Sequence, residues 1–74
     1  MNYDYSKLEG RIVEKCGTRK RFGEKMNVSE RTLSLKLNNK LSWKQSEINK
    51  AINILEIPEN EIHMYFFTPK VQCY

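Results

Sequence analysis

The sequence predicts an all-α fold built from five short helices joined by tight turns. Apolar residues recur at helical spacing in several separate windows, and residues that cap or end helices stand between those windows. No stretch of useful length alternates between apolar and polar residues as a strand does. The chain has 74 residues, which is room for one small domain. We place that domain at residues 1–67 and expect a C-terminal tail at residues 68–74.

The first helix is expected at about residues 4–16. One face of it would carry an apolar stripe of Leu8, Ile12 and Cys16, with Asp4 as a candidate N-cap. Gly17 follows the stripe, and glycine readily adopts the left-handed backbone found just past a helix end.

Two shorter helices are expected next, with Thr18 and Ser29 as their N-caps. Asn27 falls where the chain must turn between them, because asparagine tolerates a positive φ. Asn38 and Asn39 can end the third helix in the same way. The inward pairs of these two helices would be Phe22 with Met26, and Leu33 with Leu37.

The fourth helix is expected at about residues 43–55, where Ser42 to Gln45 has the pattern of a capping box. Pro58 would occupy the first position of a last short helix, and Pro69 would stop the chain from continuing it. The apolar stripes of these two helices would be Ile48, Ala51, Ile52 and Leu55, and Ile62, Tyr65 and Phe66.

The charge is concentrated in the middle of the chain. Residues 18–50 carry nine lysines and arginines against three glutamates, whereas the whole chain has a formal charge of +4. A basic segment of this kind indicates a polyanion partner such as nucleic acid. The alternative is an ordinary solvated helix surface.

Several classes of function are disfavoured. No apolar run approaches the ~20 residues of a membrane-spanning helix, and the N-terminus lacks a signal region. The two cysteines, Cys16 and Cys73, form no CxxC pair, which suits a reducing compartment. His63 has no ligand-type residue at metal-binding spacing. We therefore expect a cytoplasmic protein that is not an enzyme, with no cofactor, metal, membrane contact or small-molecule substrate.

Residues 18–40 fit a helix-turn-helix motif. Gly23 would let the two helices cross closely, Asn27 would make the turn, and Val28 would fill the space between them. A helix fits the major groove of B-DNA, so the outward face of the second helix is the candidate surface for base contacts. That face carries Ser29, Glu30, Arg31, Ser34 and Leu35.

The motif resembles the small Cro-like and repressor-like helix-turn-helix proteins of phages and prophages, a lambda-repressor-like group within the xenobiotic-response-element class. Arg19, Gly23 and Asn27 depart from the family pattern, which has Gln, Ala and Gly at these positions. The resemblance extends over residues 4–67. The matching residues are Thr18, Phe22, Val28, Ser29, Thr32, Leu33, Ser34 and the run Leu37, Asn38, Asn39 and Lys40.

The resemblance implies a sequence-specific repressor that occupies a double-stranded DNA operator in a lysis–lysogeny switch. Arg31 could bind guanine, Glu30 cytosine and Leu35 a thymine methyl group. Glu30 could equally stabilise its helix by placing a negative charge near the positive end of the helix dipole. Leu35 could contact a partner. Residues at helix ends around this face are candidates for phosphate contacts: Thr18, Arg19, Asn38, Asn39, Lys40, Lys44 and Gln45.

A second apolar feature lies near the C-terminus. Met64, Tyr65, Phe66 and Phe67 cannot all face inward on one short helix, so they are a candidate interface for a homodimer or another partner. In the alternative arrangement, Tyr65 and Phe66 close the core and Phe67 covers its edge. Trp43 is expected to bridge helices rather than to contact DNA.

A different class of function also fits these residues. The chain could be a protein-interaction modulator, an anti-repressor or co-repressor that binds another phage repressor through its helix-turn-helix face. Glu30 and Leu35 discriminate between the two classes, because an acidic and an apolar residue suit a protein partner better than DNA. An RNA-binding module is less favoured, since the sequence has no aromatic platform.

Overall fold

The computed structural model describes residues 3–69, and this part of the chain is helical, as the sequence predicts. Its one β-pairing is an isolated antiparallel bridge between Tyr3 and Pro69. A short 3-10 turn, η1 (Glu59–Glu61), precedes the last helix. The five α-helices are α1 (Ser6–Cys16), α2 (Arg19–Met26), α3 (Glu30–Leu37), α4 (Gln45–Leu55) and α5 (Ile62–Phe66).

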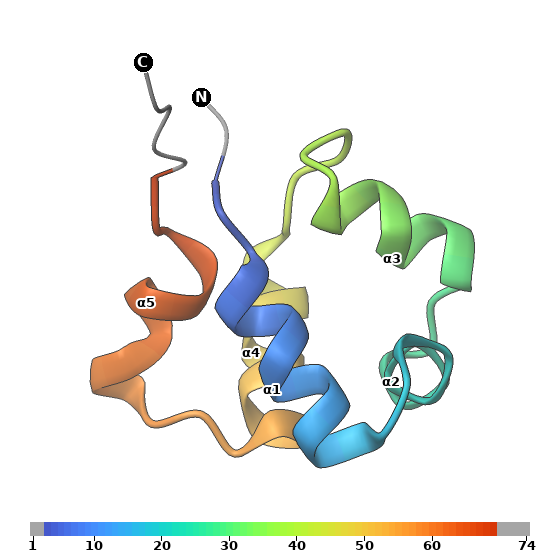
Figure 1. Ribbon diagram of the computed structural model, residues 1–74, viewed down its shortest axis with the longest axis horizontal. Coiled ribbons are helices and arrows are strands. Elements are labelled where there is room, and N and C mark those ends of the chain that lie inside the picture. Colours follow the sequence, from blue (N-terminus) through green and yellow to red (C-terminus); the bar gives the residue numbers. More distant parts are fainter. Residues whose placement is uncertain (1–2, 70–74) are drawn as a thin grey trace.

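Helix α1 lies at the centre of the arrangement. It contacts α2, α4 and α5, and α2 also contacts α3 and α4. Figure 1 shows α5 on one side of α1, the pair α2 and α3 on the other side, and α4 behind. The pair α2 and α3 therefore stands out from the body on one flank, with one long side exposed to solvent.

A single hydrophobic core joins the helices. The stripes predicted from helical spacing face inward, except that Ile52 and Ile62 are only partly buried and pack against its edge. Burial of such stripes is what stabilises helices too short to persist alone. The buried residues are Tyr5, Leu8, Ile12, Cys16, Phe22, Met26, Leu33, Leu37, Ile48, Ala51, Leu55, Ile57, Tyr65 and Phe66.

The local signals around α2 and α3 are confirmed. The hydroxyl of Thr18 accepts a hydrogen bond from the backbone N–H of Arg21 at 3.1 Å, and that of Ser29 accepts one from Thr32 at 3.1 Å. Asn27 ends α2 in the left-handed region with φ of 61°. Each cap satisfies a backbone group that the helix itself leaves unpaired.

Two other helix starts differ from prediction. Asp4 does not cap α1, which begins after Tyr5; its carboxylate instead accepts a hydrogen bond from the backbone N–H of Ser6 at 2.9 Å. The capping box predicted from Ser42 is also wrong. Helix α4 has Lys44 at its N-cap position, and the carboxylate of Glu47 reaches back to the Lys44 N–H at 2.8 Å.

The start of the last helix also differs from prediction. Pro58 directly precedes η1 instead of opening α5. The backbone carbonyl of Thr68 accepts a hydrogen bond from the N–H of Asp4 at 2.8 Å, so packing of the chain continues to Pro69. The rest of the predicted tail, residues 70–74 with Cys73, lies outside the described residues. Between residues 3 and 69, no helix is long and apolar enough to span a membrane.

Candidate interaction surface

The crossing of α2 and α3 depends on Gly23. The backbone N–H of Val28 donates to the Gly23 carbonyl at 2.9 Å. A Cβ atom at position 23 would lie only 3.1 Å from the Val28 carbonyl oxygen. Val28 is partly buried and packs against the core. The close approach predicted for Gly23 and the packing predicted for Val28 are confirmed, and both lie where the chain passes from α2 to α3.

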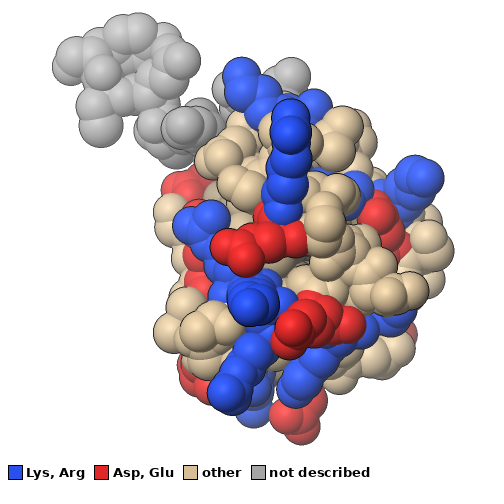
Figure 2. Space-filling view, turned by 90° about the vertical axis from the view of Figure 1, so that its right-hand side faces the viewer, with Lys and Arg blue, Asp and Glu red and all other residues tan. Residues whose placement is uncertain are grey.

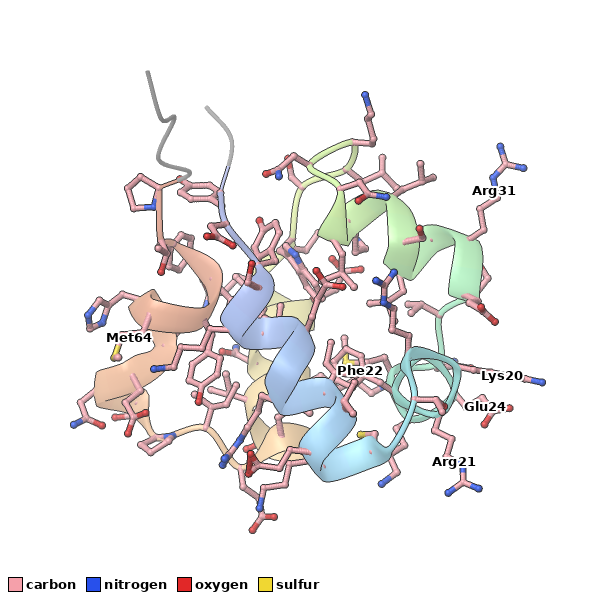
Figure 3. The ribbon with its side chains drawn as sticks, viewed as in Figure 1. Lys20, Arg21, Phe22, Glu24, Arg31 and Met64 are labelled. Atoms are coloured by element: carbon pink, nitrogen blue, oxygen red, sulfur yellow. The ribbon has the colours of Figure 1, made fainter. Side chains whose placement is uncertain are left out.

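The outer face of α3 is only partly free for contacts. Glu30 and Arg31 are exposed, and Figure 3 shows Arg31 extending away from the body of the protein. Ser34 and Leu35 are half-buried. The Ser29 hydroxyl is committed to its capping bond and to the hydroxyl of Thr32 at 2.8 Å. Glu30 and Arg31 are thus the most accessible of the predicted contact residues, while Ser34 and Leu35 are partly accessible.

Helix α2 adds charges that the sequence interpretation did not assign to the surface. Lys20, Arg21 and Glu24 are exposed and project from α2 into solvent, while Phe22 points toward the core. Figure 2 views the molecule from this side and shows basic and acidic side chains interspersed across it. A carboxylate repels phosphate, so a surface of mixed sign suits a protein better than a DNA backbone. We call Lys20, Arg21, Glu24 and the outer side chains of α3 the α2–α3 face.

Several of the side chains predicted to contact phosphate have hydrogen-bond partners within the fold. The guanidinium of Arg19 pairs with the carboxylate of Glu9 at 2.5 Å. The amide of Asn39 binds the backbone of Tyr3, accepting from its N–H and donating to its carbonyl, each at 2.9 Å. The side chains of Arg19 and Asn39 thus have partners within the fold, and their contact with phosphate stays a prediction. Only Asn39 of the predicted set is half-buried. The exposed members are Thr18, which also caps α2, Arg19, Asn38, Lys40, Lys44 and Gln45.

The C-terminal cluster predicted as a candidate interface is divided between the core and the surface. Tyr65 and Phe66 are buried where α5 packs on α1, and they close the core. Only Met64 and Phe67 are exposed, with 37% and 47% of their surface accessible. The four residues therefore do not form one surface.

Phe67 borders a hollow that the sequence did not reveal. The hollow has a volume of about 180 Å³ and lies between the N-terminal segment, the α3–α4 connection and the end of α5. Leu41 lies at its rim with 44% of its surface exposed. Three segments far apart in the sequence build it, so no local pattern predicts it. Its lining comprises Tyr3, Tyr5, Asn39, Lys40, Leu41, Ser42, Trp43, Ile48, Phe66 and Phe67.

Trp43 forms one wall of the hollow. Its ring packs edge-on against Tyr5 and Phe66, at centroid separations of 6.4 and 5.2 Å, which confirms the predicted bridge between helices. The indole Nε1 is buried and has no hydrogen-bond acceptor among residues 3–69. A buried donor without a partner is rare in folded proteins.

Lys36 positions the connection that carries Trp43. It is almost fully buried, and its ammonium donates to the Ser42 carbonyl at 3.0 Å and to the Glu47 carboxylate at 2.8 Å. The same ammonium lies 5.8 Å from the centre of the Trp43 ring. Burial alone would raise the pKa of Glu47. The hydrogen bonds and charges of Lys36 and Lys44 outweigh burial and leave that pKa below its ordinary value.

Comparison with known proteins places the chain in a family. It belongs to the family described as "Protein of unknown function (DUF739)", whose model matches residues 1–69. No curated protein matches it. Among solved structures it is similar to the modulator of repression (MOR) of the temperate bacteriophage TP901-1 from Lactococcus lactis, determined in solution. The two share 54% sequence identity over 97% of each chain, with a TM-score of 0.80.

No Cro-like or helix-turn-helix family is among these matches. The sequence resemblance is therefore upheld in part: a phage regulator is supported, and the repressor subclass is not. Within the described residues, no group of three or more His, Cys, Asp or Glu side chains is placed to hold a metal ion.

Proposed function

We propose that this chain modulates phage repression by binding a repressor protein, rather than by occupying an operator itself. The observation that carries the proposal is the similarity to a phage modulator of repression along nearly the whole length of both chains. Sequence identity of 54% is high enough for related surface chemistry as well as a related fold. The proposal corresponds to the protein-interaction alternative left open by Glu30 and Leu35.

The α2–α3 face is the surface that we propose for the repressor. Its interspersed charges offer specific pairing to a protein, and Leu35 adds an apolar contact that DNA phosphates cannot use. Arg31 extends from this face into solvent and is the residue we expect to contribute most to binding, since arginine is enriched at interface hot spots.

Binding of the modulator would act on the repressor by mass action. If it binds the free repressor in preference to the operator complex, operator occupancy falls. If it binds the operator complex more tightly, occupancy rises. A fall in operator occupancy would identify an anti-repressor, and a rise would identify a co-repressor.

The test uses the purified chain, the repressor from the same phage genome and a labelled operator duplex. Calorimetry should detect a stoichiometric complex of the two proteins, and fluorescence polarisation should show a changed operator affinity. Arg31→Ala should weaken the protein complex by about tenfold. The matched control Lys15→Ala removes one positive charge from exposed α1 surface and should leave binding unchanged. Absence of a complex with the unaltered chain would overturn the proposal.

Direct operator binding is the second candidate function. The specific observation in its favour is Arg31, an exposed arginine on the outer side of a short helix, in a segment with a net positive charge. Selection from a random duplex pool tests it. Enrichment of a two-fold site with half-sites about 34 Å apart would support a dimeric operator-binding protein. Binding that depends on salt but not on sequence would argue against it.

A further inference from the structure

We infer that Lys50 of α4 is a positioning residue, which sets the orientation in which α3 presents the α2–α3 face. The Lys50 ammonium donates a hydrogen bond to the backbone carbonyl of Met26, the last residue of α2, at 3.1 Å. The inference rests on the proposed function and extends it, because it names a residue outside the α2–α3 face that governs how well this face binds the repressor.

Helix α3 has few attachments to the rest of the protein. Helix α1 packs on α2, α4 and α5, whereas the main helix neighbour of α3 is α2. Figure 1 shows α3 at the edge of the molecule, on the side of α1 opposite to α5. Leu33 and Leu37 bury its inner side, but apolar packing is not directional. The orientation of α3 therefore depends on how the two ends of the α2–α3 pair are held.

Lys50 holds the pair at the end of α2. The last carbonyl groups of a helix have no partner within the helix, and a positive charge near them is favourable. At Met26 the partner comes from a residue 24 positions further along the chain. The next residue, Asn27, lies in the left-handed region with φ of 61° and turns the chain toward α3. The bond from Lys50 thus fixes the point at which the chain leaves α2.

Glu47 holds the same pair at its other end. Its carboxylate accepts a hydrogen bond at 2.8 Å from Lys36, which lies in the last turn of α3 and is buried. Glu47 precedes Lys50 by three residues on α4, so the two side chains leave α4 on one side. A single contact would leave the pair able to pivot. Two contacts, one before α3 begins and one in its last turn, restrict its direction.

Helix α4 is a firm support for these contacts, since it is itself bound to α1. The Arg11 guanidinium donates to the carbonyls of Leu55 and Glu56 at the end of α4, each at 2.9 Å. Glu56 lies in the left-handed region with φ of 54°. The ends of α2 and α4 are therefore built alike, each with a left-handed residue and with a cation from another helix on its last carbonyls. Helix α1 holds α4, and α4 holds the α2–α3 pair.

The first test measures the orientation of α3 without the repressor. Lys50→Met keeps an unbranched stem and removes the ammonium, while Lys50→Arg retains a donor and the charge. Lys15→Met is the matched control, because it makes the same change at an exposed lysine of α1. Residual dipolar couplings of the backbone N–H groups report the orientation of α3 relative to α1 and α4. They should change on α2 and α3, and not on α1 and α4, in Lys50→Met, and Lys50→Arg should restore them.

The second test measures the affinity for the repressor by calorimetry. Circular dichroism and thermal unfolding first establish that each variant is folded at the temperature of the measurement. Only molecules in which α3 is correctly oriented bind, so Lys50→Met should weaken the complex by about fivefold. Lys50→Arg and Lys15→Met should each change the affinity by less than about twofold. A lysine that only stabilises the fold would lower the midpoint of thermal unfolding and leave both the couplings and the affinity unchanged.

The outcomes separate this inference from the proposed function. Unchanged couplings on α3 in Lys50→Met would overturn the inference, and repressor binding by the unaltered chain would leave the proposed function standing. Changed couplings with unchanged affinity would overturn it too, since orientation would then not govern binding. Weaker binding with unchanged couplings would mean that Lys50 touches the repressor itself, which also contradicts a positioning role. Absence of a complex with the unaltered chain would overturn the proposed function and, with it, this inference.

Discussion

At the scale of single residues, the pair Lys36 and Glu47 is the most consequential polar contact of the fold. Only 6% of the Lys36 side chain and 20% of the Glu47 side chain is exposed. Removing one member of such a pair leaves the other desolvated and unpaired, which costs more than an exposed ion pair contributes. The contact also holds the α3–α4 connection, because Lys36 binds the Ser42 carbonyl and Glu47 binds the Lys44 N–H.

We therefore expect Glu47→Gln to lower the free energy of unfolding by about 2 kcal/mol at neutral pH. Urea denaturation followed by circular dichroism measures the change. The control is Lys15→Ala, which breaks the exposed pair of Lys15 and Glu56 and should cost less than about 1 kcal/mol. An equal decrease in the free energy of unfolding in the two variants would show that the buried pair contributes no more to stability than the exposed pair.

The effect of Glu47→Gln should also depend on pH. The pKa of Glu47 is lowered in the folded state below its ordinary value of 4.5, because the hydrogen bonds and charges of Lys36 and Lys44 outweigh burial. A lowered folded pKa means that the charged carboxylate stabilises the protein above the unfolded pKa, and that this contribution is lost as pH falls through the folded value. The stability difference between the two proteins should be full at pH 7 and shrink below pH 4.5. A constant difference across that window would contradict the assignment.

At the scale of elements, α2 and α3 were the most predictable part of the chain. Thr18, Ser29 and Asn27 act through backbone groups within three residues of themselves, so their types alone indicate their roles. The start of α4 was less predictable. From their residue types, Ser42 and Glu47 could each take part in capping α4. Which of them does so depends on Lys36, which lies on α3 and binds both the Ser42 carbonyl and the Glu47 carboxylate.

Two glycines in helices provide a matched test of the crossing of α2 and α3. Gly10 lies on α1 with nothing within 4 Å of an added Cβ, whereas a Cβ on Gly23 would lie 3.1 Å from the Val28 carbonyl oxygen. Gly10→Ala should raise the free energy of unfolding by about 0.5–1 kcal/mol, since alanine favours helix more than glycine does. Gly23→Ala should gain nothing or be destabilising. Thermal unfolding compares the two, and equal stabilisation would mean that the close crossing is not required.

At the scale of the whole molecule, the hollow could not be predicted. The hollow is lined by residues from both ends and the middle of the described chain, including Tyr3, Leu41 and Phe67. These three residues lie outside the apolar stripes of the helices. Only the completed packing brings them together. The fold class could be predicted because helical periodicity and helix capping are both set by residues close together in the sequence. The interaction surface could not, because it depends on which residues remain exposed once the core has formed.

The uneven distribution of charge leads to a prediction at the same scale. Lys20 and Arg21 project from the face proposed for the repressor, so they should speed association more than they slow dissociation. The double variant Lys20→Ala with Arg21→Ala should lower the association rate constant, and the difference should shrink at high salt. Stopped-flow mixing at two salt concentrations measures it. A changed dissociation rate with an unchanged association rate would place these residues inside the contact instead.

The contacts of Tyr3 determine how one wall of the hollow is held. Its backbone is held by the Asn39 amide and by pairing with Pro69, so the first described residues are joined to the middle and the end of the chain by a few hydrogen bonds. Long-range contacts of this kind open locally at a lower free-energy cost than the core. The shape of the hollow therefore depends on contacts that join the beginning, the middle and the end of the described chain.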